Sequence, residues 1–581
     1  MASRSGAVHV SVTRRTYKGT VYETTLLRQS YREGGKVKTR TVGNLSHLPA
    51  RMVELIRRGL AGEVLFGEGD LEVKRSRGHG HVQLVLGLAR ELGLDRLLGP
   101  RPTRERQLAL ALVVGRVLFP CSKLASTRAW ADTTLLEELG VEGPVDVHEL
   151  YRALDWLLER QPAVERALVS RHLPAGSVVL YDVSSSYFTG RRCELARHGH
   201  SRDHRGDLPQ VVYGVVTDAA GRPVAIEVFE GNTHDCKTVL AQVEKLRRRH
   251  GLRRVVIVGD RGMITDVQVA ELERYPAVDW VTALTNPRVA GLVDSGALQL
   301  GLFDDRDVAA VESPDFPGQR LVACRNPALA ASRAAKREVL LQRTEARLAR
   351  LAARVARGAL RGEAAIGEAL GRAWGRDHMR KHFLVEVGAS SLSFRRDEGA
   401  ISREAALDGV YVVRTSVADG PGWTDADVVR TYKRLAEVER VFRCMKTTQL
   451  LARPIFHRDA GRVRAHLFLC MLGAHLAWEL EHRLAEFLFV DTALEASIPS
   501  RDPVRPPSPS AEGRRKRATQ RLADGSAPLH GLRTLLQSMG SLARVTLQVA
   551  EGATFDRDAT PTPWQQRVLD AGKNSPGAPP A

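Results

Sequence analysis

The hydrophobic pattern of the chain changes its period near residue 178, and this change constrains the fold more than any other feature. Helical periodicity comes first, and then three β-type segments follow, VVLYDVSSSYF, VVYGVVTDAAG and PVAIEVFEGN. A helical segment, TVLAQVEKLRRRHG, and a short apolar strand, VVIVGD, complete the series. An all-apolar strand of this kind is typical of the buried centre of a sheet. The order β-β-β-α-β predicts an α/β fold, in which an antiparallel meander is followed by a crossover.

Two aspartates occupy strands of this predicted sheet. Asp182 lies inside the first strand, and Asp260 ends the apolar strand VVIVGD. A carboxylate in an apolar strand costs free energy unless a charged group compensates it. A carboxylate at the C-terminal end of a strand lies where α/β sheets hold their ligands. The pair can therefore converge on Mg²⁺, which prefers carboxylate oxygens. The alternative is that Asp182 and Asp260 only cap turns, and it stays open for either residue taken singly.

A third carboxylate is expected from the segment YKRLAEVERVFRCMK, residues 432–446. On a helical wheel of about 100° per residue, five apolar residues form one face: Leu435, Val438, Val441, Phe442 and Met445. Glu439 falls at the edge of this face, on one line with Tyr432 and Lys446. Glu437 falls on the solvent side. The wheel therefore predicts that Glu439, and not Glu437, points from the packed face into a cleft.

The charge of the chain favours a polyanionic partner. Its 581 residues include 86 Lys and Arg against 67 Asp and Glu, a formal net charge of +19. Such an excess attracts nucleic acid, whose phosphates give a strong, salt-dependent affinity. The first 44 residues carry nine basic and two acidic side chains, net +7, around the turn-like segment YREGGKVK. This hairpin is either a DNA-contacting module or an edge that Lys and Arg protect from unwanted strand pairing.

The remaining sequence features indicate a soluble protein of a reducing cytoplasm. The six cysteines are scattered without a C-x-x-C pair, which argues against a zinc ribbon or a disulfide scaffold. The start of the chain lacks the apolar region of a signal peptide. The most apolar helical segment, residues 466–480, is too short to span a bilayer. His198, His200 and His204 lack the spacing of a zinc finger, so a solvated loop near DNA is favoured over a zinc site.

Composition and periodicity divide the chain into six parts. Residues 286–404 hold weak strands around a long Ala/Arg-rich helical stretch, at about 328–374, and they interrupt the α/β pattern. The predicted parts are a basic β-hairpin unit (1–75), a helical domain (76–172), the first part of the α/β core (173–285), an α+β insertion (286–404), the second part of the core (405–495), and a linker with a C-terminal tail (496–581).

The ordered carboxylates and their flanking segments resemble the DDE transposases of bacterial insertion sequences. The resemblance is to the group with the signature Y-x2-R-x3-E-x6-K, an insertion-sequence-four-like superfamily. Tyr432, Glu439 and Lys446 match this signature, whereas Leu435 stands in the arginine position. The segments YDVSSSYFTG, GDRGM and ALDGVYVVRT agree as well, and the resemblance runs from about residue 80 to about 490.

The resemblance implies a ribonuclease-H-like core with an insertion between the second Asp and the Glu. It implies that Asp182, Asp260 and Glu439 are the catalytic metal ligands, for Mg²⁺ or alternatively Mn²⁺. Tyr432 and Lys446 are expected to contact DNA phosphates. Arg443 is expected to bind DNA too, and Arg443 or Arg434 is a candidate for the phosphate contact that Leu435 does not make.

The expected function is transposition: cleavage of the ends of an insertion sequence, then transfer of the freed 3′-OH to target DNA by two-metal phosphoryl transfer. The expected partners are the terminal repeats and the target DNA, with a homodimer in the active complex and association with the nucleoid. Two other functions stay open. One is a ribonuclease-H-like nuclease that cuts DNA without strand transfer, and the other is an inactive DNA-binding relative.

Overall fold

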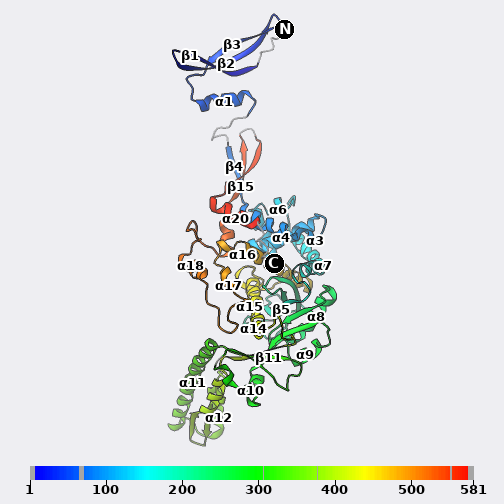
Figure 1. The fold of residues 1–581 in the computed structure, drawn as a ribbon, viewed down its shortest axis with the longest axis vertical. Helices are drawn as coiled ribbons and strands as arrows, with labels where there is room; N and C mark the ends of the chain where they lie inside the picture. Colours follow the sequence, from blue (N-terminus) through cyan, green and yellow to red (C-terminus); the bar gives the residue numbers. More distant parts are fainter. Residues whose placement is uncertain (1–6, 64–70, 305, 376, 550–551, 574–581) are drawn as a thin grey trace. The chain divides into compact units, whose positions relative to one another are not determined.

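The computed structural model describes residues 7–63, 71–304, 306–375, 377–549 and 552–573 (Figure 1). The chain forms two compact units. The first combines Met1–Arg77 with Ala543–Ala559, and the second combines Gly78–Leu542 with Thr560–Ala581.

Among its described residues, the first unit contains two small sheets and one helix. Strands β1 (Val8–Tyr17), β2 (Thr20–Glu33) and β3 (Lys36–Asn44) pair in sequence order. Gly34 and Gly35 form the turn between β2 and β3, both with positive φ, which glycine adopts at no steric cost. The predicted hairpin is therefore confirmed, and β1 extends it. The other elements are α1 (Ala50–Leu60), β4 (Leu71–Gly78), β15 (Ala543–Val549) and β16 (Thr554–Asp558), with β15 between β16 and β4.

The second unit is a mixed α/β structure around one large sheet. The eight strands are ordered β10-β11-β14-β9-β8-β5-β6-β7. Their bounds are β5 Ser177–Tyr187, β6 Gln210–Thr217, β7 Pro223–Glu230, β8 Val255–Val258, β9 Val278–Ala283, β10 Val308–Val311, β11 Arg320–Arg325 and β14 Val410–Thr415.

The pairing of these strands confirms the predicted meander and crossover. Strands β5, β6 and β7 pair in an antiparallel way, and α8 (Cys236–Glu244), extended by the π-helical turn Lys245–Arg249, leads from β7 to β8. Strand β8 is parallel to β5, and β9 is parallel to β8. The sequence VDWVTA of β9 was not recognised as a strand, because its only charged residue breaks a short apolar run. Helices α9 (Asp266–Leu272) and α10 (Asn286–Asp294) follow β8 and β9.

Residues 286–404, expected as an insertion, divide between the sheet and a separate helical part. Strands β10 and β11 pair with each other, and β11 pairs with β14 within the main sheet. The chain leaves the sheet only after β11. The helical part has its own small core around Leu341 and Leu348, and α11 and α12 lie side by side (Figure 1). Its elements are α11 (Pro327–Ala356), α12 (Glu363–Trp374), β12 (Phe383–Val387), β13 (Leu392–Arg396) and α13 (Glu398–Ala406).

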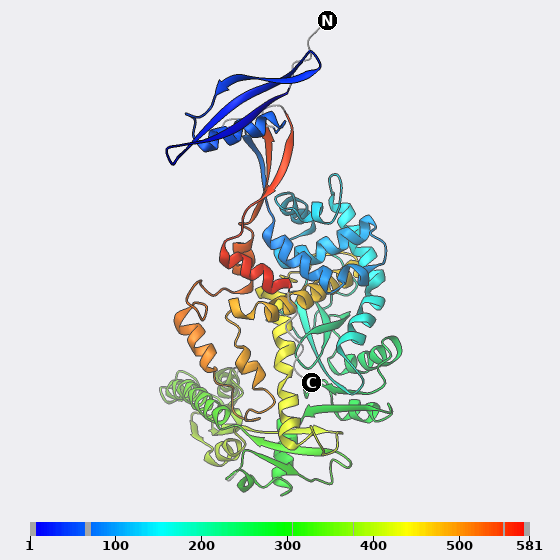
Figure 2. The same ribbon diagram turned by 45° about the horizontal axis from the view of Figure 1, so that its top comes forward.

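Helices that precede the sheet in the chain pack together with a helix that follows it, and both contribute to the main core. Helix α16 (Ala460–Arg483) packs against α4, α7 and β7 (Figure 2), and its side chains are buried around most of the helix. A helix that is apolar all round is expected in such an interior position. The helices that precede β5 are α2 (Gly80–Glu91), α3 (Leu94–Leu98), α4 (Arg104–Leu118), α5 (Lys123–Ala131), α6 (Leu135–Glu138) and α7 (Val147–His172).

No single helix in the described ranges is long and apolar enough to cross a membrane. Helices α4 and α5, bent by 86° at the break between them, reach that length and apolarity only as a pair.

The C-terminal 86 residues, expected as linker and tail, contain regular structure. The polar last 30 residues predict partial disorder, with PTPWQQRVL as a candidate docking helix, and this helix is present. The short amphipathic helices before it do not stand out from the Pro- and Ser-rich start of the segment. Leu535, Leu536 and Met539 are buried along α19, and Val568 and Leu569 of the segment PTPWQQRVL dock α20 on α2. These elements are α17 (Thr492–Ala496), α18 (Ala511–Thr519), α19 (Leu532–Met539) and α20 (Pro563–Lys573).

Candidate active site

Strands β5 and β8 bring the two predicted aspartates to the same end of the sheet. The parallel register pairs Leu180 of β5 with Val258 of β8. Asp182 and Asp260 each follow two residues later on these adjacent strands. Asp182 is half-buried, and its Oδ1 accepts a hydrogen bond of 2.8 Å from the backbone N–H of Val183. Asp260 is exposed where the strand opens into the loop.

The electrostatics of Asp182 show that other carboxylates lie near it. Burial raises the pKa of Asp182 to about 7. The negative charges of Asp260 and Glu439 raise this pKa further, while the Val183 N–H and the Arg202 guanidinium lower it. Like charges that meet in a desolvated place disfavour ionisation of the most buried one. The charges of Asp260 and Glu439 therefore reach the carboxylate of Asp182.

Glu439 comes to this place on a short helix that packs on the sheet. Helix α15 (Leu435–Arg443) lies against β5 and β6, and it buries Val438, Val441 and Phe442. Glu439 itself is exposed beside the buried face. The helix is not continuous with its neighbours, since α14 (Asp425–Lys433) ends before it and a π-helical turn, Cys444–Thr448, follows it.

Glu437 is a correction to the helical-wheel prediction. It was expected on the solvent side of the helix, but it is half-buried, and burial raises its pKa. Its Cβ would lie 2.7 Å from a Cβ placed on Gly221, so only glycine leaves room for it in the turn between β6 and β7. The wheel was wrong because it counted one covering surface, the sheet, and not this turn. Glu437 also pairs with Arg440 at 3.0 Å.

Tyr432 contacts a predicted metal ligand. Its Oη donates a hydrogen bond of 3.0 Å to Oδ1 of Asp260. Burial, followed by the charge and hydrogen bond of Asp260, raises the pKa of Tyr432, so the phenol keeps its proton. The helix that carries Tyr432 begins with a capping box, in which Thr424 and Asp427 satisfy each other's backbone N–H groups. Tyr432 therefore orients Asp260 in this structure.

Lys446 contacts a buried aspartate that the sequence analysis missed. Its Nζ lies 3.0 Å from Oδ1 of Asp203, whose side chain is only 2% exposed. Asp203 also pairs with Arg453 and accepts a hydrogen bond of 3.2 Å from the backbone N–H of Tyr187, at the end of β5. No sequence signal separated Asp203 from Asp207 in the segment RHGHSRDHRGD. Its burial arises only when the loop folds back on β5.

Arg202 is a second residue that the sequence analysis missed. It pairs with Asp235 at 2.5 Å, and its backbone N–H donates to Oγ of Ser185 on β5. Its positive charge lowers the pKa of Asp182. Arg202 thus provides a cation beside the most buried carboxylate of the site. In the sequence, nothing separates Arg202 from the other basic residues of RHGHSRDHRGD, because its place beside β5 arises only when the loop folds.

The arginines considered for the missing signature contact lie in different surroundings. Leu435 packs on the main core. Arg434 is directed to the turn between β6 and β7, where its Nη1 lies 3.4 Å from the carbonyl oxygen of Ala219. Burial lowers the pKa of Arg434. Arg443 is exposed at the end of α15. Of the two, Arg443 has the more open position for a ligand.

The donor set of this site suits a hard cation. In the described part of the chain, no three His, Cys, Asp or Glu side chains are gathered tightly enough to form a ready-made metal site. His198, His200 and His204 are exposed in the loop after β5. The three carboxylates on β5, after β8 and on α15 nevertheless supply oxygen ligands only, which is the set that Mg²⁺ prefers.

Comparisons with known proteins agree with this arrangement. A family model described as the transposase DDE domain matches residues 174–476, and a model described as the N-terminal domain of IS1634 family transposases matches residues 10–67. No curated protein matches. A solved structure titled "Cryo-EM structure of piggyBac transposase synaptic complex with hairpin DNA (SNHP)" has a TM-score of 0.32 and 10% identity, over 68% of this chain and 70% of that chain. That likeness is too low to support an inference. The DDE match spans 303 of the 581 residues and includes both strand aspartates and α15, so the chain belongs to the DDE transposases of insertion sequences and is a transposase.

Proposed function

We propose that the chain cleaves DNA at the ends of its mobile element and joins the freed 3′-OH to target DNA, with Asp182, Asp260 and Glu439 as the metal-binding carboxylates. One observation carries this proposal: the pKa of Asp182 is raised by burial and by the charges of Asp260 and Glu439. Two strands and one helix, distant in sequence, carry these carboxylates and would bring them together around a cation. Such convergence of like charges is typical of a functional site.

The strand order supports a ribonuclease-H-like core. Counted from β5, the first three strands form an antiparallel meander, and the next two, β8 and β9, add on the other side of β5 in parallel. Asp182 then belongs to the first strand and Asp260 follows the fourth. The helical part after β11 interrupts the core between Asp260 and Glu439, as the resemblance implies.

Asp182, Asp260 and Glu439 would hold Mg²⁺, or Mn²⁺ in its place. When bound, such ions activate a water and stabilise the leaving oxygen of a phosphodiester. The residues of the chain do the positioning. Asp182 is fixed by the Val183 N–H, and Asp260 by the Tyr432 hydroxyl. Both bonds hold a carboxylate oxygen in one direction, which limits the rearrangement needed to bind a cation.

The cations around the site are suited to a DNA strand. Arg202 lies near Asp182, Lys446 lies at the C-terminal end of β5 through its pair with Asp203, and Arg443 is exposed on α15. We expect Lys446 and Arg443 to contact phosphates and so fix the register of the strand on the sheet. Lys446 can do so without breaking its ion pair, because an ammonium group donates three hydrogen bonds.

The partners follow from the same reasoning. The basic N-terminal unit, with its match to a transposase N-terminal domain, is proposed to bind the terminal repeats. Because two element ends must be processed together, a homodimer is proposed for the active complex. DNA as the partner would keep the protein with the nucleoid.

The test uses purified full-length protein, Mg²⁺ and a DNA duplex that carries the terminal repeat. We expect nicked and joined products from the wild type and neither product from Asp182→Asn. Asp207→Asn, in an exposed ion pair of the loop after β5, serves as the control and should retain both. Undiminished cleavage by Asp182→Asn would overturn the site. Cleavage without joined products would leave a nuclease.

A further inference from the structure

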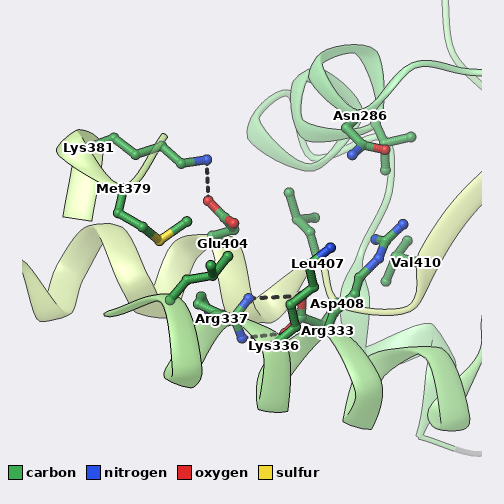
Figure 3. A pocket seen from close by; sticks show the side chains of 12 residues that line it. Asn286, Arg333, Lys336, Arg337, Met379, Lys381, Glu404, Leu407, Asp408 and Val410 are labelled. Atoms are coloured by element: carbon green, nitrogen blue, oxygen red, sulfur yellow. Dashed lines mark hydrogen bonds and ion pairs between the residues drawn. The ribbon is translucent and has the colours of Figure 1, made fainter. Parts of the chain in front are cut away.

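Two hollows of the second unit are lined by cations, and they differ in how these cations are neutralised. The first hollow, of about 350 Å³, lies between α10, α11 and α13. Figure 3 shows two of its four cations paired: Arg337 donates to Asp408 at 3.0 Å, and Lys381 pairs with Glu404. Its buried cation therefore has a carboxylate of the chain itself. The buried charge of this first hollow is therefore neutralised within the protein itself.

The second hollow, of about 600 Å³, lies between α4, α5, the segment 451–459 and the start of α16. We call it the basic hollow. Its charged lining consists of five cations and one carboxylate: Arg116, Lys123, Arg453, Arg458, Arg462 and Asp459. The carboxylate of Asp459 is already engaged, since it caps α16 by accepting a hydrogen bond of 3.0 Å from the backbone N–H of Arg462.

The two innermost cations of the basic hollow have no carboxylate partner among the residues that the structure describes. Lys123 is 4% exposed and Arg116 is 6% exposed. Arg116 donates to the carbonyl oxygen of Leu450 at 3.3 Å. Burial, and then the charge of Arg116, lowers the pKa of Lys123 to about 7. Burying two like charges together without a counter-ion is costly, and an anion in the hollow would relieve that cost.

The surroundings do not supply the missing negative charge. At the rim, Arg462 pairs with Asp155 at 3.0 Å, and Arg453 pairs with Asp203. Two histidines border the inner cations. Burial and these cations lower the pKa of His457 to about 3. Burial and the same cations lower the pKa of His466, whose buried Nδ1 has no hydrogen-bond partner within the described ranges.

Two helix N-termini add to the positive potential of the basic hollow. Helix α5 begins at Lys123, with Ser122 as its cap, and α16 begins at Ala460. Ser122 and Lys123 line the hollow, as do residues of the first turn of α16. Helix N-termini carry a partial positive charge and unpaired N–H groups, which favour phosphates. They act here together with the buried side-chain charges.

We infer that the basic hollow binds a phosphate group of the DNA strand through Lys123 and Arg116. This inference rests on the proposed function. The size of the hollow and its rim favour DNA over a free anion, because Phe456 is 64% exposed and Leu451 is 39% exposed there. Exposed apolar and aromatic groups beside cations suit a sugar and a base next to a phosphate.

The basic hollow is connected to the candidate active site through two sets of contacts. Asp203 pairs with both Arg453 at the rim and Lys446 of the signature. The segment 451–459 is also attached to the end of β5, since Ile455 donates to Tyr187 at 3.2 Å and accepts from Thr189 at 3.0 Å. A strand bound at Lys446 can therefore continue over Arg453 into the hollow.

The first test measures thermal unfolding of the full-length protein with and without inorganic sulfate, which carries the same shape and charge as a phosphate group. The wild type should gain stability with sulfate. Lys123→Met should unfold at a higher temperature than the wild type without sulfate, because it removes an uncompensated buried charge, and should not respond to sulfate. Lys336→Met, in the first hollow, should respond as the wild type does. A sulfate response that persists in Lys123→Met overturns the inference.

The second test measures the affinity for a terminal-repeat duplex by fluorescence anisotropy at several salt concentrations, without divalent metal. Lys123→Met should bind about tenfold more weakly, and the slope of log K against log salt should fall by about 1. Arg116→Met, a second variant, should weaken binding similarly. If sulfate binding is lost but DNA affinity and slope are unchanged, the hollow takes a small anion and not DNA, which overturns the inference.

The two proposals can fail separately. Normal cleavage together with unaltered DNA binding in Lys123→Met would rule out DNA binding in the basic hollow and would leave the proposed active site unaffected. If the wild type binds DNA through Lys123 but never cleaves it, the proposed function is ruled out and phosphate binding in the basic hollow still holds. Arg254→Met, at an exposed position at the other end of β8, controls for a general loss of positive charge.

Discussion

The candidate active site and the basic hollow are opposites in charge and alike in construction. At the ends of β5 and β8, the charges of Asp260 and Glu439 act on the half-buried Asp182, and the charge of Arg202 opposes them. In the basic hollow, Arg116 and Lys123 lie together, and the described residues offer them no carboxylate. Each region leaves its own charge unneutralised. Each therefore fits a ligand of opposite sign, a divalent cation in one and a phosphate in the other.

Other buried charges in the same unit show what a purely structural solution looks like. Glu165 of α7 is fully buried, and it pairs with Lys245 at 2.8 Å and accepts a hydrogen bond of 3.0 Å from the backbone N–H of Ile226. Arg337 and Asp408 form a similar pair in the first hollow. The fold can thus satisfy a buried charge internally. Where a buried charge has no internal partner, we propose that the protein gives up some stability in order to bind a ligand there.

The largest effect is expected from a substitution of Asp182 in the candidate active site. Asp182→Asn should reduce Mg²⁺-dependent cleavage by on the order of 10³-fold, since bound metal supplies several kcal/mol of transition-state stabilisation. Without metal, the same variant should unfold at a higher temperature, because a crowded carboxylate is gone. Rate measurements with added Mg²⁺ or with a chelator, and thermal unfolding, check both outcomes. A less stable Asp182→Asn would mean that the carboxylate is structural.

The second largest effect is expected at a buried carboxylate that the protein pairs internally, Glu165. Glu165→Gln should destabilise the protein by about 2 kcal/mol, because Lys245 loses its fully buried partner and keeps only Glu227, at 3.0 Å, and the carbonyl oxygen of Ile226. Denaturant unfolding measures this change. Glu159→Gln, exposed on the same helix, should be neutral within about 0.5 kcal/mol. If Glu165→Gln leaves the free energy of unfolding unchanged, buried charges with and without an internal partner do not differ as proposed.

The third effect is a pH dependence of the basic hollow. Lys123 has a pKa lowered to about 7, and a bound anion favours its charged form. Binding therefore takes up a proton above this pKa, so sulfate affinity should fall roughly tenfold between pH 6 and pH 8.5. Sulfate keeps its charge over that range. The facing groups are Arg116, His457, His466, Cys121 and Cys470, and the two histidines stay neutral there.

The stability of the protein should change with pH in the same window. The unfolded state binds the Lys123 proton up to the ordinary lysine pKa of 10.5, whereas the folded state releases it at about 7. Between these values the unfolded state holds more protons, so the contribution of Lys123 to stability rises with pH. Titration calorimetry with sulfate and thermal unfolding should show both trends in the wild type and neither in Lys123→Met. Trends of equal size in the variant would assign them to another group.

The smallest effect comes from a group that orients a ligand. Tyr432→Phe removes the hydrogen bond to Asp260 and keeps the ring, so cleavage should slow by about tenfold. The Mg²⁺ concentration for half-maximal cleavage should rise as well, which simple loss of a DNA contact would not cause. An unchanged Mg²⁺ requirement together with weaker DNA binding would restore Tyr432 to the role of a phosphate contact.

The sequence predicted those parts of the fold that periodicity controls. Apolar alternation identified β5, β6, β7 and β8, and the strand position of Asp182 and Asp260 pointed to their meeting. The wheel selected Glu439 and misjudged Glu437, because a wheel holds no information about the β6–β7 turn that covers Glu437.

The parts that the sequence did not predict depend on contacts between distant segments. Asp203 becomes a buried anchor only when its loop returns to β5. Lys123 looks like any helix-starting lysine until α16 and the segment 451–459 cover it. The short amphipathic helices of the C-terminal part carry too few apolar residues to stand out beside Pro-rich neighbours. A buried charge is a property of tertiary structure, and a single sequence does not reveal it.

The most direct measurement compares Glu439→Gln with Glu437→Gln in Mg²⁺-dependent cleavage of terminal-repeat DNA. The two residues lie two positions apart on α15, and both substitutions preserve shape. The account predicts that Glu439→Gln loses cleavage while still binding DNA, and that Glu437→Gln, a neighbour of Gly221 away from Asp182, cleaves like the wild type. Cleavage retained by Glu439→Gln, or lost in a folded Glu437→Gln, would contradict it.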